Sequence, residues 1–466
     1  MDKTVYLKWF IDKRFDDEKV RLQHGLVLKC LSSENPDPTS PRKRVPRCEP
    51  TTFDSLRIEM YPPFISKSKH SGKVSRHVFE ARSILPWKIL RYSQINSTPT
   101  NISSLYGGYG DVQKIVIHPW QHDFHKDLEK MGAESSCFAL KRLYASNEKA
   151  FDQEVQQLER FGGRHPHIVT LLSTIILQSS QPTYQLLFPL ADCDLLGYWE
   201  LRPQPKDQVA LSWVAEQLFG MADALSFIHN PGLKVGDKSL YGRHGDIKPE
   251  NVLLFKRRDR DTLVLSDLGL TMTHGEQSRS NRPGETIPTS PNYRPPECDI
   301  DGKKGHVSRA FDIWTLGCLF LEFLVWIFDG WDGYIKFKER LYSLYINGMV
   351  TCLYFEIVRV GERDFAFKVK DVIHESMLNL VETRMLLVRS KEVDRITAQD
   401  LRNKLQAIKN DCKSKSYCVD PCPRPSFNQP RLPVRARLNS MAQQYIDRDH
   451  INFKDHRGAT SSFENI

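Results

Sequence analysis

RHGDIKPENVLLF, residues 243–255, is the most informative stretch of this chain. Within it, Asp246, Lys248 and Asn251 stand at relative positions 0, +2 and +5, and an apolar run follows them. Transfer of a phosphoryl group needs a carboxylate to orient the attacking hydroxyl and accept its proton, a cation near the migrating group, and an oxygen ligand for magnesium. A single loop with this spacing supplies all three groups.

A second run, LVLSDLGL, follows at residues 263–270 and presents Asp267 at the end of an expected strand, as a hairpin partner of the first run would. A carboxylate at a strand end beside Asn251 is a natural magnesium site. Either segment alone also fits a polar surface loop. The two together, in this order, favour a phosphoryl-transfer site.

These segments resemble the eukaryotic protein-kinase family, whose catalytic loop reads H-R-D-x-K-x-x-N and whose activation segment begins with D-F-G. The first segment looks especially like that of fungal kinase-domain proteins that carry HGDIKPEN, and the resemblance spans about 300 of the 466 residues. It implies Asp246 as the catalytic base and Lys248 as a phosphate-stabilising cation. It also implies Asn251 and Asp267 as metal ligands, with ATP and Mg²⁺ as cofactors.

Two residues depart from the family pattern. Gly245 stands where many kinases carry an arginine that binds a phosphate on the activation loop, so we expect little dependence on phosphorylation of that loop. Leu268 replaces the phenylalanine of D-F-G and should keep its apolar packing role.

Upstream, FALKRL places Lys141 on an expected strand, and its resemblance to V-A-I-K implies that this lysine holds the α- and β-phosphates. Its ion-pair partner should lie on the next helix, residues 151–161. We favour Glu154, whose neighbour one turn on could pack inward. Glu159 is the alternative, because the separation of Lys141 from Glu154 is short for the family.

The glycine loop is an imperfect match. In LYGGYGDV, residues 105–112, Gly107, Gly110 and Val112 fit the later positions of G-x-G-x-x-G-x-V, but Leu105 replaces the first glycine. Glycines let backbone N–H groups approach a phosphate closely, although this segment alone fits any tight hairpin. The longer stretch 118–136 that follows is interpreted as a loop insertion.

The resemblance also implies an adenine pocket between the two lobes. It would be formed by Ala139, by Phe188 as gatekeeper and by Leu190 in the hinge.

Downstream, SPNYRPPE at residues 290–297 resembles the end of the activation segment. Glu297 should form a buried ion pair with Arg395, and Asp312, in FDIWTLGC, should brace the catalytic loop. Ser290 falls where serine/threonine kinases carry a threonine, and with Lys248 it favours a serine or threonine acceptor.

The organisation of the chain favours an α+β fold with two lobes. Strand-like runs at 113–119, 137–143 and 184–190 precede long helical patterns at 213–229, 313–328 and 397–408, the last with Thr397 as N-cap. We expect a partly flexible N-terminal extension over 1–86 and a kinase domain over 87–412. The domain divides into a β-rich N-lobe at 87–190 and a helical C-lobe at 191–412, and a basic, disordered tail follows at 413–466.

Composition sets further limits. Hydrophobic residues make up 40% of the chain and charged residues 26%, with a net charge of +9, which is ordinary for a soluble protein. The ten cysteines form no C-x-x-C pair and are expected to be reduced, in the cytoplasm or nucleus. The start of the chain is too charged for a signal peptide, and residues 313–328 are too short to span a bilayer comfortably. We expect a protein substrate as partner, and neither nucleic acid nor a membrane.

Three functions are compatible with these motifs. A protein serine/threonine kinase fits them best. The small-molecule phosphotransferases share H-G-D and the later asparagine, but they lack the Lys-Pro-Glu, Pro-Pro-Glu and D-x-W-x-x-G features. A pseudokinase, which keeps the fold as a nucleotide-binding or scaffold module, is favoured by the imperfect glycine loop. It is disfavoured by the presence of Lys141, Asp246, Asn251 and Asp267 together.

Overall fold

The computed structural model divides the chain into two units, residues 1–57 and 58–466. It describes residues 62–90, 106–413 and 434–436 of the second unit. Within these ranges the residues left undescribed are 71, 81–82, 108–109, 135, 144–147, 236–237, 258–259, 269–271, 275–281, 284–289, 301–305, 347, 362–363, 371–380 and 390–393. Most of the expected extension and tail therefore lies outside the described residues.

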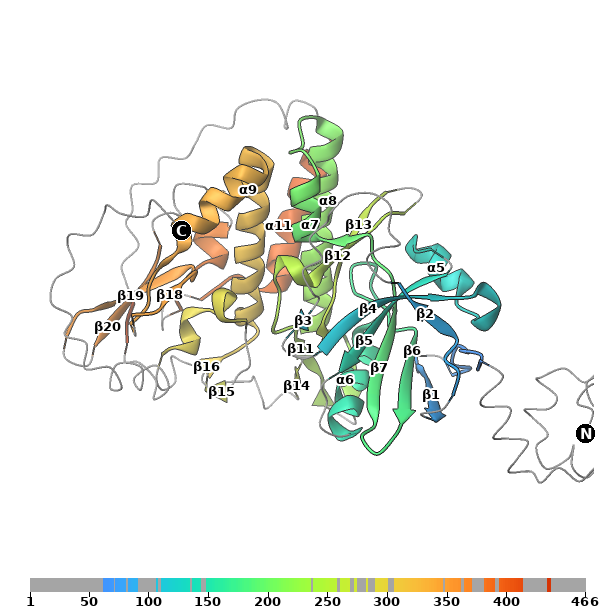
Figure 1. Ribbon diagram of the computed structural model, residues 1–466. Helices are drawn as coiled ribbons and strands as arrows, with labels where there is room; N and C mark the ends of the chain where they lie inside the picture. The colour runs from blue at the N-terminus through green and yellow to red at the C-terminus, as the bar shows by residue number, and fades with distance from the viewer. Residues whose placement is uncertain are drawn as a thin grey trace, which may run out of the picture. The chain divides into compact units, whose positions relative to one another are not determined.

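The first part of the second unit is a seven-stranded sheet with the order β1-β6-β7-β5-β4-β2, in which β3 also pairs with β4 (Figure 1). The expected strands are present, and buried residues alternate with partly buried ones along most of β5, which places one row of side chains in the core. The strands are β1 Ser75–Glu80, β2 Trp87–Ile89, β3 Tyr106–Gly107, β4 Gly110–Ile117, β5 Cys137–Leu143, β6 Ser173–Gln178 and β7 Thr183–Pro189.

Helix α6, Glu148–Phe161, lies between β5 and β6 in sequence and starts earlier than the predicted helix. Its buried residues recur every three or four positions, as an amphipathic helix on a sheet requires. They are Phe151, Val155, Leu158 and Phe161. The polar face of the helix, which carries its acidic residues, is left for contacts with other segments.

Strand β1 corrects the expected start of the folded domain at residue 87. It pairs in parallel with β6, in a register that joins Ser75 to Ser173 and Glu80 to Gln178. The buried His77 and Phe79 alternate with exposed Arg76 and Val78, which is the period-two pattern of a strand with one covered face. The sheet thus begins inside the segment that was assigned to the extension.

The stretch 118–136 is not simply a loop, as the sequence indicated. It contains a 3₁₀ turn, Pro119–Gln121, and helix α5, His125–Met131, which ends at Gly132 in the left-handed conformation (φ 72°). Phe124 and Leu128 are buried in a hydrophobic cluster with Ile65 and Phe79 of the N-terminal segment. The insertion and that segment therefore cover the same part of the sheet.

Beyond residue 190 the chain is mainly helical, as expected for a second lobe (Figure 1). The helices are α7 Leu195–Leu201, α8 Gln208–His229, α9 Ala310–Leu341 and α11 Ala398–Asp411. Helices α8 and α11 pack against each other. The predicted N-cap of α11 is present, because Thr397 Oγ1 accepts the Asp400 N–H at 3.1 Å.

Helix α9 is twice as long as the predicted helix 313–328, because two helical segments join at Gly330, whose φ is 70°. By length and composition it could cross a membrane, but 94% of its most apolar window is buried inside the protein. It is the central core helix of the C-lobe, where it packs Trp314, Phe320 and Trp326 into the main hydrophobic cluster.

Short sheets complete the C-lobe. Antiparallel strands β12, Val252–Phe255, and β13, Thr262–Leu265, are joined by β8, Cys193–Asp194. The remaining pairs are β9 Lys234–Val235 with β10 Lys238–Ser239, β11 Tyr241–Arg243 with β14 Met272–His274, β15 Arg282–Pro283 with β16 His306–Val307, and β17 Ser343–Leu344 with β18 Val350–Thr351. Short helical turns lie at Pro249–Asn251, Pro291–Tyr293, Pro296–Cys298 and Val381–Met385.

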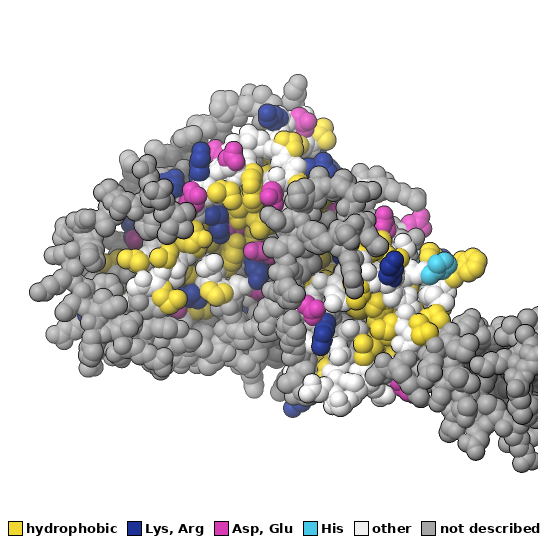
Figure 2. Space-filling model, viewed as in Figure 1, with side chains coloured by type: hydrophobic (Ala, Val, Ile, Leu, Met, Phe, Trp, Pro, Cys, Tyr) yellow, Lys and Arg dark blue, Asp and Glu magenta, His cyan; other side chains and the backbone are white. Residues whose placement is uncertain are grey.

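The expected disordered tail contributes a strand. Strand β21, Val434–Ala436, pairs with β20, Phe365–Val369, which in turn pairs with β19, Phe355–Arg359. Backbone pairing fixes this part of the tail to the C-lobe, which corrects the expectation of disorder for residues 434–436. Figure 2 shows hydrophobic side chains exposed in this region, where Leu344, Val350 and Val358 are among the exposed apolar residues.

Candidate active site

Lys141 lies where the sheet meets the helical part of the chain. Its Nζ donates to Asp267 Oδ1 at 2.8 Å and to Glu154 Oε1 at 3.2 Å. Glu154, rather than the alternative Glu159, is therefore the partner on helix α6. Three segments, β5, α6 and the end of β13, meet at this one ammonium group.

Burial and the neighbouring charges shift the pKa values of Lys141 and of Glu154. Burial alone would lower the pKa of the Lys141 ammonium, but the carboxylates of Asp267 and Glu154 outweigh it and raise that pKa. Burial raises the pKa of Glu154, against the attraction of Lys141 and with a further increase from Asp267. The shorter distance makes Asp267 the closer counter-charge of the lysine.

The residues of the predicted catalytic loop form a second cluster. Asn251 Nδ2 donates to Asp246 Oδ2 at 2.7 Å and to the Asp246 carbonyl at 2.8 Å. Lys248 Nζ lies 3.1 Å from Asp246 Oδ2 and donates to Ser290 Oγ at 2.8 Å. Ser290 Oγ in turn donates to Asp246 Oδ1. The carboxylate of Asp246 and the ammonium of Lys248 therefore lie together, as the sequence predicted, and the Ser290 hydroxyl contacts both.

Ser266 connects the two clusters. Its N–H and its hydroxyl both donate to the Asn251 carbonyl, at 2.8 and 2.9 Å, so Asp267 directly after it is held beside Asn251. Among the described residues, Asp267 is the one non-glycine with positive φ, 56°, a conformation that aspartate tolerates better than most residues. In this conformation its Oδ1 accepts the hydrogen bond from Lys141 Nζ.

The residues predicted to bind magnesium fit that ion in their chemistry. Since Asn251 donates through Nδ2, its amide oxygen is directed elsewhere, and the carboxylate of Asp267 is a second hard oxygen donor. The described residues contain no group of three or more His, Cys, Asp or Glu side chains able to hold a metal. Magnesium sites that also use substrate phosphates need only one or two carboxylates.

Asp312, on helix α9, accepts hydrogen bonds from the backbone of the predicted catalytic loop. Its Oδ1 accepts the Gly245 N–H and its Oδ2 accepts the His244 N–H, both at 2.8 Å, and Oδ2 also lies 2.8 Å from His229 Nε2. Burial would raise the pKa of this fully buried carboxyl, but its hydrogen bond with His229 and the nearby positive charges lower it. The bracing role predicted from the sequence matches this geometry.

Gly245 meets a backbone requirement at this point. Its φ of 88° lies in the region that favours glycine, while its N–H is engaged by Asp312. The glycine therefore supplies a turn in the loop, and no side chain extends from this position toward the activation segment.

The glycine hairpin lies on the strand next to Lys141. Gly107 pairs with Gly110 across β3 and β4, and Val112 pairs with Lys141 across β4 and β5. The two residues between the glycines, 108–109, are outside the described residues. The hairpin is thus placed one strand from the lysine, as a phosphate-covering loop would be.

The three predicted adenine-pocket residues lie at the same end of the sheet. Ala139 pairs with Phe188 across β5 and β7. Leu190 follows directly after β7, and the next residues return to the C-lobe, where the Asp192 N–H donates to the Leu254 carbonyl at 2.9 Å. Phe188 and Leu190 are both half-buried.

Two structural predictions concern the two ends of the expected activation segment. Arg395 forms a two-pronged pair with Glu297, Nη1 to Oε1 at 2.6 Å and Nη2 to Oε2 at 2.9 Å, with both side chains buried. Leu268 is 1% exposed and packs in the main cluster, as a replacement for phenylalanine should.

Sequence reasoning missed a buried polar cluster around Glu322. This carboxylate on α9 accepts from Tyr293 at 3.0 and 3.1 Å, from Lys338 at 2.7 Å, and from the Tyr354 hydroxyl. It ties Tyr293, just beyond Ser290, to the core helix. The signal in the sequence was the single acidic residue within an apolar run, since such a residue needs partners.

Comparison with known proteins agrees with these findings. Over residues 130–405 the chain matches the protein kinase domain family. It is 27% identical to the serine/threonine-protein kinase SSN3 of Coccidioides immitis, over 38% of this chain and 35% of that protein. It is 27% identical to the serine/threonine-protein kinase PKH3 of Eremothecium gossypii, over 47% and 27%. It is 28% identical to cyclin-dependent kinase 2 of Caenorhabditis elegans, over 34% and 38%. The chain thus spans from about a quarter to two fifths of the length of these curated relatives.

Proposed function

We propose, because this chain belongs to the protein kinase family, that it transfers the γ-phosphate of ATP to a serine or threonine hydroxyl of a protein substrate. The observation that supports this most is the continuous series of contacts from Glu154 through Lys141 and Asp267 to Asn251, Asp246 and Lys248. In this series the link between Asp267 and Asn251 is Ser266, whose N–H and hydroxyl donate to the Asn251 carbonyl.

Each residue has a step in this reaction. Asp246 orients the acceptor hydroxyl and takes its proton as the oxygen bonds to the γ-phosphorus. The bond from that phosphorus to the bridging oxygen breaks, and its electrons leave with ADP. Lys248 faces the transferred group and Lys141 binds the other phosphates. Asn251 and Asp267 would hold Mg²⁺, which neutralises developing phosphate charge when bound.

The acceptor preference and the mode of activation rest on two further residues. Ser290 contacts both Asp246 and Lys248, which favours a serine or threonine hydroxyl over the longer tyrosine side chain. Gly245 offers no cation to a phosphate on the activation segment, so activity should be independent of phosphorylation there. The scattered cysteines, which form no C-x-x-C pair, favour a reducing compartment, and we propose a cytoplasmic or nuclear location.

The decisive experiment is a radiolabelled-ATP assay of the purified chain on a peptide library, with Asp246→Asn beside the wild type. This change removes proton acceptance and should lower kcat by roughly 10²–10⁴ while the melting temperature is kept. Equal rates for the two proteins would contradict the assignment of the base.

Binding without turnover would replace this proposal by the pseudokinase function. In that case Mg²⁺ and ATP together would raise the melting temperature of the wild type, but no peptide would be labelled. Asp267→Ala should remove the magnesium-dependent part of ATP binding under either function, which a titration with and without Mg²⁺ measures.

A further inference from the structure

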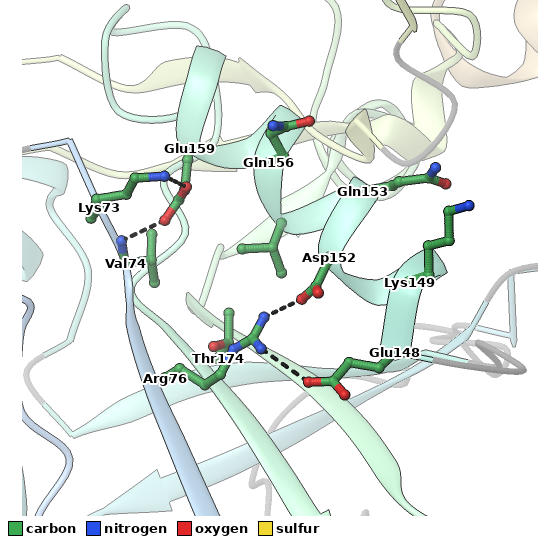
Figure 3. A pocket seen from close by; sticks show the side chains of 11 residues that line it. Lys73, Val74, Arg76, Glu148, Lys149, Asp152, Gln153, Gln156, Glu159 and Thr174 are labelled. Carbon is green, nitrogen blue, oxygen red and sulfur yellow. Dashed lines mark hydrogen bonds and ion pairs between the residues drawn. The ribbon is translucent and has the colours of Figure 1, made fainter.

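The segment just before β1 contacts the C-terminal end of helix α6 (Figure 3). Lys73 Nζ lies 2.7 Å from Glu159 Oε2, and the Val74 N–H donates to Glu159 Oε1 at 3.0 Å. The Glu159 side chain is 13% exposed, whereas that of Lys73 is 66% exposed, so water screens this ion pair from the side of the lysine. Glu159 was the alternative to Glu154 as the ion-pair partner of Lys141. In the structure it connects the helix to the N-terminal segment instead.

Arg76, within β1, contacts the other end of the helix. Its Nη1 donates to Glu148 Oε1 at 3.2 Å and its Nη2 donates to Asp152. Its guanidinium also lies 5.3 Å from the centre of the Phe151 ring, within the range of a cation–π contact. Figure 3 shows this arginine pointing from the strand toward the first turns of the helix.

Between these two points of attachment lies a hollow of about 620 Å³ (Figure 3). Its lining is mostly polar side chains of α6 and of the N-terminal segment, together with Val74, Val155 and Thr174. The charged contacts at the two ends of α6 therefore add to the apolar packing of Val74 and Val155 in the main cluster. A helix held in this way can change its tilt when the end contacts change.

The strand itself is anchored independently of α6. All six of its residues pair with β6, and Phe79 is buried in the cluster that also contains Phe124 and Leu128 of the insertion. Ser75 is tied further to the sheet, since its carbonyl accepts from Thr174 Oγ1 at 3.2 Å. The segment is thus a fixed support against which the helix is held.

We propose that Lys73–Arg76 is a built-in brace that positions helix α6 and, through Glu154, the Lys141 ammonium. Arg76 and Glu159 are positioning residues in this arrangement. The inference rests on the proposed function, because Lys141 matters for turnover only in a kinase. It means that the active position of α6 is set from within the chain, by residues upstream of the glycine hairpin.

Loss of the brace should act as a shift between a positioned and a displaced helix. If ATP binds both states about equally, only the fraction able to react falls, so kcat drops while KM is nearly unchanged. Exposed ion pairs contribute modestly, so we expect Arg76→Ala and Glu159→Ala each to lower kcat about 3- to 10-fold. KM for ATP should change less than about twofold. Arg76→Lys and Glu159→Gln should recover part of the loss.

Lys67→Ala is the matched control. Lys67 belongs to the same N-terminal segment and forms an ion pair of 2.6 Å with Asp127, but that partner is on α5 and not on α6. This variant removes a similar surface charge pair and should leave kcat at the wild-type value.

A double-mutant cycle separates positioning from general destabilisation. In a Glu154→Ala background the helix no longer reaches Lys141, so Glu159→Ala should have no further effect on kcat. If the fold-loss in kcat of the double variant equals the product of the two single fold-losses, the proposal is wrong.

Hydrogen exchange decides the same question without relying on activity. In Glu159→Ala the amides of α6 should exchange faster while those of β5 and β7 stay as protected as in the wild type. Unchanged exchange in α6 would refute the brace. If the wild type transfers no phosphate, the kinase proposal fails, and this exchange measurement still tests the brace by itself.

Discussion

At the scale of single residues, the polar motif positions were predictable because phosphoryl transfer demands fixed residue types at short spacings. Asp246, Lys248 and Asn251 lie within six residues of one another, so the local chain alone brings them close. Glu322 was missed for the opposite reason. Its partners Tyr293 and Lys338 stand 29 and 16 residues away, and only the completed fold brings them together.

The Glu297–Arg395 pair carries a stability prediction at this scale. Both side chains are buried, and Arg395 also donates to the Ala310 and Leu387 carbonyls at 2.9 Å. Glu297→Gln or Arg395→Met alone should reduce the free energy of unfolding by roughly 3–5 kcal/mol, because each leaves a buried charge unpaired. Urea denaturation measures this loss.

The double variant Glu297→Gln/Arg395→Met should lose clearly less than the sum of the single losses, because no charge is then left behind. Strictly additive losses would show that the pair acts as two independent contacts.

At the scale of elements, long periodic segments were predictable and short ones were not. Helix α8 and helix α9 repeat their apolar pattern over many turns, whereas α5 has seven residues and one buried side chain. Strand β1 is stabilised by pairing with β6, about a hundred residues onward, and a local pattern of six residues does not reveal such a partner.

His167 contacts both strand β13 and helix α8, and its titration predicts how the free energy of unfolding depends on pH. Its Nδ1 donates to the Leu263 carbonyl at 2.6 Å, and its ring occupies the space above Gly220, where an added Cβ would lie 2.1 Å from Nε2. Burial lowers the pKa of this imidazole to about 4, with smaller effects from the Leu263 carbonyl, His165 and Arg257.

The direction in which the free energy of unfolding changes with pH follows from the binding of protons to this histidine. An unfolded histidine takes up a proton below its ordinary pKa of 6.5, and the folded one does so only near pH 4, so the free energy of unfolding falls as pH drops across this interval. Between pH 7 and pH 5 this residue should account for a loss of about 2 kcal/mol. The variant His167→Gln keeps a hydrogen-bond donor but does not titrate. Its free energy of unfolding, measured by urea denaturation, should therefore fall by about 2 kcal/mol less than that of the wild type between pH 7 and pH 5. Identical pH dependence in the two proteins would contradict this.

At the scale of the whole chain, the two-lobed α+β class followed from strand patterns preceding helical ones, and the structure agrees. The expected boundaries were less accurate. The sheet begins at β1 rather than at residue 87, and β21 returns from the tail to the C-lobe. Both differences involve edge strands, whose partners are distant in sequence and whose own composition is unremarkable.

Removing the tail tests this organisation. A chain ending at residue 413 loses the pairing of β21 with β20, which leaves the backbone of Phe365–Phe367 unpaired on that side. An unpaired edge lowers stability and favours aggregation, so we expect a lower melting temperature, by about 2–4 °C for each kcal/mol lost, and more light scattering on heating. A chain ending at residue 440 keeps β21 and should melt like the full chain. Equal melting of all three chains would show that β21 contributes nothing.

The parallel pairing of β1 with β6 also affects how the protein is made. Ser75 leaves the ribosome 98 residues ahead of Ser173, which at roughly 5–20 residues per second is an interval of about 5–20 s. During that time the segment whose inward-facing side chains are His77 and Phe79 has no partner strand. Factors that bind nascent chains have that interval in which to act, and the sheet closes only when translation has passed β6.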